Sequence, residues 1–449
     1  MTNTPATPAD PALTDATGSV EQPQGQLPPA GGADRGRLRG FRAFRHPGFR
    51  IYFAGMVFRG LAMWMPLVAI PWLAVELGAT PAQVGIVTGF FFLPTFFVGP
   101  MGGVLADRVE RRKVLILSQL FASALSAVIF LLILSESQTL PILAAASFGF
   151  GLLIAVEVPV RQAFMTEMVP IRDISSAASL HATAWNATRL LGPVLAGVMV
   201  ATIGAASPFV FAAVASLVVS ASIVWMDRYR EPGRQRADRS HSILSDLRAG
   251  ASFVLHEPVV GLSLLLIWAA AMLGMSTFTT LAPIYVQEEL GLGADGFGAF
   301  LGASGAGALT AALLVTTFAH GDRRVWLSVS VMAMAVLVAG IGLTRSTETV
   351  FVLAFLLGAA QISLAQNALV SVHSATPDLL RGRVMGIWVM TFQGSSLFGS
   401  VLSGWLADVF GVRSSMLIAA LALAVVGSVA IVAIRRADWR LTPAASRSA

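Results

Sequence analysis

The segment Arg108–Leu134 reads RVERRKVLILSQLFASALSAVIFLLIL, with four basic residues near its start and no charge from Val114 onward. An uncharged run of this length is long enough to cross a hydrocarbon layer of ~30 Å as a helix. Backbone polar groups in lipid must be paired within the spanning structure, so each such run is expected to be a helix and not an isolated strand. The basic residues mark the end that faces the cytoplasm.

The same pattern recurs along the chain. The 449 residues are 55% hydrophobic and only 12% charged, about half the charged fraction of an average soluble domain. The apolar runs of spanning length cover residues 49–75, 82–105, 113–134, 139–160, 174–203, 207–226, 259–286, 295–319, 325–343, 349–371, 382–407 and 412–434. The sequence therefore predicts an all-α membrane protein with twelve transmembrane helices.

The basic residues fix the predicted orientation. Of the 30 Lys and Arg residues, 26 fall in the two tails or in alternate loops between the predicted spans. The loops on the other side hold only Arg345 and Arg413, and two more arginines lie inside spans. Because cytoplasmic loops carry the excess of positive charge, we expect a multi-pass protein of the bacterial cytoplasmic (inner) membrane with both termini in the cytoplasm. Basic loops of this kind face anionic lipid, so no nucleic-acid partner is predicted.

A polar, basic stretch divides the chain into two sets of six spans. Within it, apolar residues from Ile243 to Leu255 recur with helical spacing, which predicts an amphipathic helix along the membrane surface. The predicted organisation is a disordered cytoplasmic tail (1–40), an N-terminal six-helix bundle (41–226), a cytoplasmic linker with the amphipathic helix (227–258), a C-terminal six-helix bundle (259–436) and a cytoplasmic tail (437–449).

The two sets of spans resemble each other. A shift of 207 residues places Leu191–Gly197 (LGPVLAG) on Phe398–Gly404 (FGSVLSG), and Gly204 on Gly411, without a gap. A parallel repeat of two six-helix halves is a known transporter layout, so the halves are predicted to be pseudo-symmetric. Small residues in the repeated stretch favour close helix packing, and the predicted packing residues are Gly192, Pro193 and Gly197.

Catalytic and metal chemistry find no support in the sequence. The chain has no cysteine and only six histidines, which form no short-spaced pair. Thiolate catalysis, disulfides and cysteine-based metal sites are therefore excluded, and no phosphate-binding glycine loop or nucleophile–base set is present. We predict no catalytic residues, no metal and no cofactor.

Three motifs carry a resemblance to a known family. Gly103–Lys113 (GVLADRVERRK) resembles the loop signature of the major facilitator superfamily, with Glu110 where the signature has glycine. Glu157–Ala163 (EVPVRQA) and Asn186–Gly197 (NATRLLGPVLAG) resemble the drug:proton antiporter branch that includes the enterobactin exporter and macrolide efflux proteins. The resemblance covers roughly residues 41–436.

The resemblance implies a function. A member of this branch would be a monomeric secondary active transporter that exports an amphipathic small molecule, drug or siderophore-like, by alternating access, with the proton gradient as energy source. The alternative is a facilitator or importer of a small metabolite. The residues expected to hold the cytoplasmic side closed are Asp107, Arg108, Arg112 and Arg161. The alternative for Asp107 is a helix-end charge that only sets topology.

Charges inside the spans are the candidate functional groups, since an ionisable side chain at mid-membrane costs ~2.5–3.5 kcal/mol on insertion scales. Glu157 is the one carboxylate well inside a span, and Arg161 lies one turn further on the same helix face. With Arg59 and Arg189 they could form a buried network. Glu157 is predicted to couple proton movement to transport, since low dielectric favours its neutral form and a nearby guanidinium its charged form.

Two alternatives stay open at this stage. Glu157 and Arg161 could be a permanent ion pair that only shapes the end of the helix. Arg59 and Arg189 could instead bind an anionic substrate. The resemblance implies that polar and aromatic residues of several spans line a central substrate cavity, and the candidates are Arg59, Trp64, Asn186, Arg189, Trp268, Gln361, Asn367 and Trp388.

Overall fold

The computed structural model describes residues 39–99, 109–229, 243–318 and 323–436, and these residues form helices and short connections. The helices of the first predicted set, which we call the N-half, are α1 (Pro47–Glu76), α2 (Pro81–Val98), α4 (Arg111–Leu134), α5 (Leu140–Met165), α6 (Ile174–Thr202) and α7 (Ser207–Met226). Short 3-10 turns flank them at η1 (Arg39–Arg45), η3 (Ile171–Asp173) and η4 (Asp227–Tyr229).

The second set, the C-half, begins with one helical span in which two segments are π-helical. This span consists of α9 (Pro258–Ala269), η5 (Ala270–Met275), α10 (Ser276–Ile284) and η6 (Tyr285–Glu289). The remaining helices of the C-half are α11 (Ala294–Phe318), α12 (Arg323–Leu343), α13 (Thr347–Ala375), α14 (Asp378–Phe410) and α15 (Val412–Arg436). In the sequence, α8 (Ile243–His256) lies between the two halves. It packs on α14 of the C-half, with Gly250 close to Ile387 and Arg383.

Within the described residues, twelve helical segments have the length needed to cross a membrane. Eleven of them are both long and apolar enough by hydropathy. The twelfth is α6, a helix of 29 residues whose mean hydropathy is lowered by polar residues such as His181 and Arg189. The predicted all-α fold of twelve spans is confirmed, and the described bounds agree with the predicted runs to within about five residues. The end of the second run and the last residue of the eighth lie outside the described residues.

Local sequence signals set several helix ends. Proline occupies the first position of α1, α2 and α9, where its missing N–H costs nothing. Thr80 and Gln83 form a reciprocal capping box at the start of α2. Gly204 and Gly411, which the 207-residue shift pairs, follow α6 and end α14, and both have positive φ, at 119° and 85°. Glycine adopts this left-handed region without the steric cost of a Cβ.

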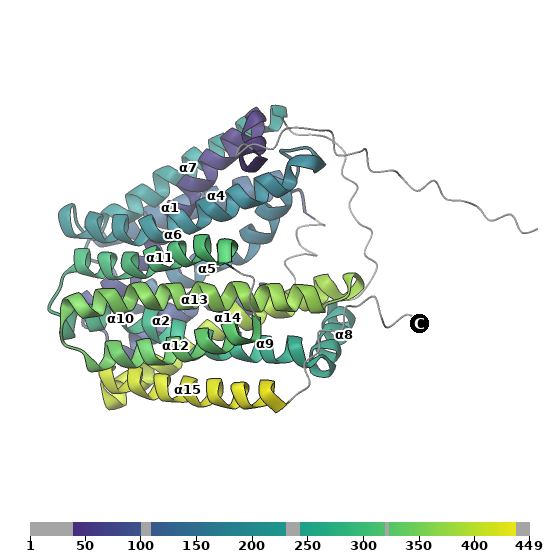
Figure 1. The fold of residues 1–449 in the computed structure, drawn as a ribbon. Helices are drawn as coiled ribbons and strands as arrows, with labels where there is room; N and C mark the ends of the chain where they lie inside the picture. The colour runs from purple at the N-terminus through teal and green to yellow at the C-terminus, as the bar shows by residue number, and fades with distance from the viewer. Residues whose placement is uncertain (1–38, 100–108, 230–242, 319–322, 437–449) are drawn as a thin grey trace, which may run out of the picture. The chain divides into compact units, whose positions relative to one another are not determined.

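The two halves meet through two long helix pairs (Figure 1). Helix α2 of the N-half packs along α14 of the C-half, and α6 packs along α11. Glycine faces glycine at each pair: a Cβ on Gly85 would lie 2.5 Å from the carbonyl oxygen of Ser400 and 3.1 Å from Cα of Gly404, and one on Gly197 would lie 2.6 Å from Cα of Gly298. Ordinary contacts of a Cβ begin near 3.4 Å, so only glycine fits.

These glycine contacts lie toward one end of the bundle. Gly85 is near the start of α2, Gly197 near the end of α6, and Gly298 near the start of α11. This end, where α1 ends and α2 begins, is called the outer end here, because the charge pattern predicts it to be extracytoplasmic. Trp72 and Phe297 also stack across the halves at this end, with ring centroids 5.7 Å apart. The halves are thus in close backbone contact at the outer end.

Candidate functional site

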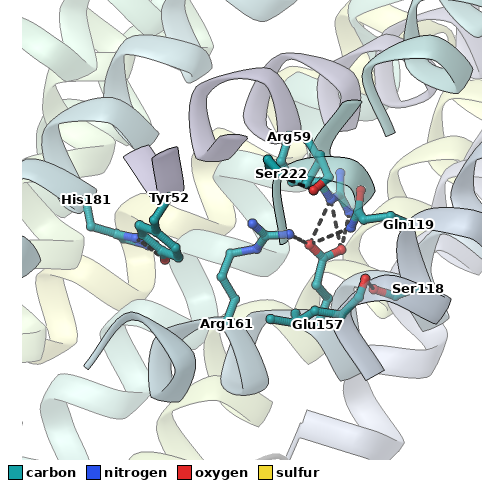
Figure 2. Close-up of polar contacts among 10 residues, drawn as sticks. Tyr52, Arg59, Ser118, Gln119, Glu157, Arg161, His181 and Ser222 are labelled. Carbon is teal, nitrogen blue, oxygen red and sulfur yellow. Dashed lines mark hydrogen bonds and ion pairs between the residues drawn. The ribbon is translucent and has the colours of Figure 1, made fainter. Parts of the chain in front are cut away.

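A cluster of four polar side chains lies inside the N-half, and Glu157 is its centre (Figure 2). The Glu157 carboxylate accepts hydrogen bonds from Arg59 Nε at 2.9 and 2.8 Å and from Gln119 Nε2 at 2.9 Å, and it pairs with Nη2 of Arg161. Arg59 Nη2 also lies 2.7 Å from Glu157 Oε2. The donors come from three helices: α1, α4 and α5. We call these residues the Glu157 cluster.

The Glu157 cluster is buried and deep within the helices. Glu157 is only 2% exposed, and Gln119 is fully buried. Glu157 lies eight residues before the end of α5 at Met165, which is about 12 Å at the ~1.5 Å rise per residue of a helix. Two guanidinium groups and one carboxylate give the cluster a formal charge of +1. Carboxylates inside a membrane bundle are rare and costly, and they mark ion or proton pathways more often than simple structure.

A second pair of polar side chains lies on the other side of Arg161. The hydroxyl of Tyr52 lies 3.1 Å from Nδ1 of His181, which joins α1 to α6. Figure 2 shows the Arg161 side chain between this pair and Glu157. Arg161 therefore lies next to a polar contact between α1 and α6.

A small cavity adjoins the Glu157 cluster on its outer side, with room for about one water molecule. Arg59, Met63 and Ser216 line it together with Ser126, whose buried Oγ has no hydrogen-bond partner. Unsatisfied buried hydroxyls of this kind are usual sites for internal water.

The structure assigns different surroundings to the two arginines of the spans. Arg59 belongs to the Glu157 cluster, together with Arg161, whose contact with Glu157 was expected from their i, i+4 spacing. Arg189 does not reach this cluster: its Nη2 donates instead to Oε1 of Gln361 on α13, at 3.3 Å. The contact joins the N-half to the C-half close to the midpoints of α6 and α13.

The other predicted cavity residues are dispersed. Trp64 packs on Gly192, where an added Cβ would lie 2.5 Å from the indole ring. Trp388 is buried and stacks on Phe392, and Asn367 donates its Nδ2 to the Ser363 carbonyl. Trp268 is 40% exposed. The side chain of Asn186 lies outside the described residues. The carbonyl of Pro193 would lie 2.7 Å from a Cβ on Gly298, which places Pro193 at the contact between α6 and α11.

The residues predicted to close the cytoplasmic side are only partly visible. Asp107 and Arg108 lie outside the described residues. Arg112 pairs with Asp227 at 3.5 Å and Arg111 with Glu167 at 2.6 Å, and both contacts stay within the N-half. Arg161 is held by Glu157. The gating roles of these four residues stay predictions.

Gln119 is the member of the Glu157 cluster that the sequence reasoning missed. It is the lone amide in the mostly apolar run 113–134. A side-chain amide in a transmembrane helix bonds to a neighbouring helix or to water in a cavity, so its presence in this run was a usable signal. What the sequence could not supply was its partner on α5.

Two six-helix halves related by a parallel sequence repeat, with charged and amide side chains buried inside them, are a known layout of membrane transporters. A solved bacterial homologue of the human lysosomal transporter Spinster, in an inward-facing and unoccupied conformation, has a TM-score of 0.70 to this structure at 13% sequence identity. The match covers 87% of this chain and 97% of that one. The likeness shows that the fold is that of this transporter class.

The family follows from the sequence. The family model described as transmembrane secretion effector matches residues 39–446. The chain therefore belongs to this family of major facilitator superfamily transporters. Among its relatives, the multidrug efflux pump Tap of Mycolicibacterium fortuitum is 26% identical over 404 residues, covering 86% of this chain and 95% of Tap. The enterobactin exporter EntS of Citrobacter koseri is 24% identical over 389 residues, covering 85% and 90%.

Proposed function

We propose that this transporter exports an amphipathic small molecule from the cytoplasm by alternating access, in exchange for protons, and that Glu157 takes up and releases the proton. The observation that carries the proposal is the Glu157 cluster. Burying a carboxylate in a spanning helix costs insertion free energy, and helices can pack without one. Its presence, with donors from three helices, therefore favours a functional role. Export is favoured over uptake because relatives that align along almost the whole chain are named as efflux pumps and exporters.

The charge balance of the Glu157 cluster suggests how a proton could drive a structural change. With Glu157 ionised, its carboxylate separates two guanidinium groups and holds both by charge-assisted hydrogen bonds. With Glu157 neutral, the cluster has a charge of +2, and the two arginines repel each other at low dielectric. Arg161 would then be displaced from Glu157 toward Tyr52 and His181, at the contact between α1 and α6. Protonation would thereby loosen the packing of α6, a helix that also meets the C-half through α11.

The test is accumulation in cells that lack their own pumps. Cells expressing wild type or Glu157→Gln are loaded with a fluorescent lipophilic cation dye or with a catecholate siderophore, with and without a protonophore. Glu289→Gln is the matched control, because Glu289 also pairs with an arginine, Arg413 Nε at 2.6 Å, but at a solvent-exposed position. Wild type and the control should lower accumulation, and Glu157→Gln or the protonophore should abolish this effect.

Folding of the variant must be measured separately, since Glu157→Gln leaves two buried guanidinium groups without a counter-charge. Membrane abundance and a monodisperse elution profile establish that the variant folds. Where it does not, proton flux is followed in proteoliposomes of the wild type, and substrate transport without proton movement contradicts the proposal. Normal export by a folded Glu157→Gln variant would assign Glu157 a structural role. Substrate accumulation raised by the wild type would favour the alternative of metabolite uptake.

A further inference from the structure

Arg189 and Gln361 form a polar contact between the two halves near the middle of their helices. Arg189 lies close to the midpoint of α6 (Ile174–Thr202) and Gln361 close to that of α13 (Thr347–Ala375), so both are at mid-membrane depth. Arg189 Nη2 to Gln361 Oε1 is 3.3 Å. The backbone at Arg189 is fixed against α11, because a Cβ on Gly305 would lie 2.8 Å from the Arg189 carbonyl oxygen. The site is therefore built on three helices from both halves.

The guanidinium of Arg189 has no counter-charge among the residues that the structure describes. Its single hydrogen bond there is to the neutral Gln361 amide. Arg59 and Arg161, by contrast, share the Glu157 carboxylate. A guanidinium carries five N–H donors, and a charge of this kind inside a membrane bundle normally pairs with an acid or faces a ligand pathway. Arg189 thus retains donors that a ligand would satisfy.

The Gln361 amide also has an N–H donor available to a ligand. Its Oε1 accepts from Arg189, which fixes the orientation of the amide and leaves Nε2 as a donor. Gln361 is 3% exposed, and its Nε2 has no hydrogen-bond partner within the described part of the chain. A buried donor without a partner costs about 1–3 kcal/mol. While Oε1 accepts from Arg189, the positions that Arg189 and Gln361 leave open are N–H donors, so a ligand at this place must bring acceptors.

We propose that Arg189 and Gln361 form an anion subsite that takes the carboxylate, or another anionic oxygen group, of an amphipathic substrate. One ligand oxygen would accept from the Arg189 guanidinium and another from Gln361 Nε2, the two-point geometry that suits a carboxylate. The bound anion would lie beside the direct contact between the two side chains, which keeps Oε1 paired, and would add a second bridge between the N-half and the C-half. This inference rests on the proposed function for the identity of the ligand as transport substrate.

The subsite is tested first by binding, independently of transport. Purified full-length protein is titrated with pyrene butyrate, its neutral primary amide, and the matching pyrenebutyl trimethylammonium cation, which share one apolar body. Wild type should bind the carboxylate tighter than the amide and the cation by about tenfold or more, the contribution of one hydrogen bond to a charged group. Equal affinities for the three probes, or no binding of any, would overturn the proposal.

Two variants separate binding from folding. Arg189→Gln should reduce the preference for the carboxylate over its amide to near one. Gln361→Glu supplies Arg189 with an internal counter-ion, so it should keep or raise the thermal stability and still abolish carboxylate binding. Gln287→Glu, the same change at an exposed position on η6, is the control and should leave the preference unchanged. A folded Gln361→Glu variant that binds the carboxylate normally would contradict the subsite.

Transport distinguishes failure of the subsite from failure of the proposed function. Export of one monoanion against one proton moves two charges, so an inside-negative potential should accelerate it, at about 2.3 kcal/mol per charge per 100 mV. Carboxylate binding without export would leave the subsite standing and refute proton-coupled export of this class. The opposite result is export of the cation by Arg189→Gln at the wild-type rate, with no preference for the anion in the wild type. That result would refute the subsite and leave proton-coupled export standing.

Discussion

The glycine contacts at the outer end make a quantitative prediction about alternating access. In the variant Gly85→Leu the new Cβ would lie 2.5 Å from the Ser400 carbonyl oxygen, where ordinary contact begins near 3.4 Å. Helices α2 and α14 must therefore separate by about 0.9 Å before the rest of the side chain is accommodated. Overpacking a close contact costs about 1–3 kcal/mol. Because this cost arises only when the outer end is closed, the equilibrium should move toward the outward-open state by about 5- to 150-fold.

The chain contains no cysteine, so a single introduced thiol reports accessibility without background. Phe297→Cys places the thiol on α11, where Phe297 stacks on Trp72 of α1, next to Gly298 and its contact with Gly197 of α6. Whole cells are treated with a membrane-impermeant maleimide, and the labelling rate of Phe297→Cys is compared with and without Gly85→Leu. The labelled thiol and the substitution lie on different pairs of helices. A change in labelling therefore reports movement of the two halves and not only local loosening around residue 85. The labelling rate should rise by the factor given above.

Gly149→Leu is the matched control, since a Cβ there would lie 2.8 Å from Cδ2 of Leu125 within the N-half. It inserts the same side chain within one half, where only the flexible Leu125 side chain must move, and it should leave the labelling of Phe297→Cys unchanged. Unchanged labelling in a folded Gly85→Leu variant would refute the view that the glycine contacts hold the outer end closed. Equal labelling in both glycine variants would show that general destabilisation exposes the thiol.

Three further predictions concern single contacts. Gly192→Ala should lower the melting temperature because its Cβ would lie 2.5 Å from the Trp64 ring, and adding Trp64→Leu should recover most of the loss; additive losses would exclude a shared contact. Gln119→Leu removes the neutral donor on Glu157 at 2.9 Å, and should cost about 1–3 kcal/mol in detergent unfolding, whereas an unchanged midpoint would make Gln119 dispensable. Glu289→Gln should change the stability by less than about 1 kcal/mol because its ion pair with Arg413 is solvent-exposed, and a larger loss would contradict this assignment.

The candidate site was only partly predictable from the chain. The i, i+4 spacing of Glu157 and Arg161 predicted their contact, which depends on one helix alone. The spacing could not decide between Arg59 and Arg189 as the next partner, since both are single arginines in spans of the same half. The structure places Arg59 on Glu157 and Arg189 on Gln361. An anionic ligand is consequently proposed at Arg189 and not at Arg59.

The sequence by itself determined the number of spans, their approximate bounds and the internal repeat. These depend on local quantities: the transfer of each segment into lipid, the pairing of backbone groups within it, and the sign of charge at its ends. The pairing of Gly85 with Gly404 and of Gly197 with Gly298, the partner of Gln119, and the two π-helical turns were decided only by the tertiary structure. They depend on how helices that are far apart in the sequence pack against each other, and no local property of either helix specifies that contact.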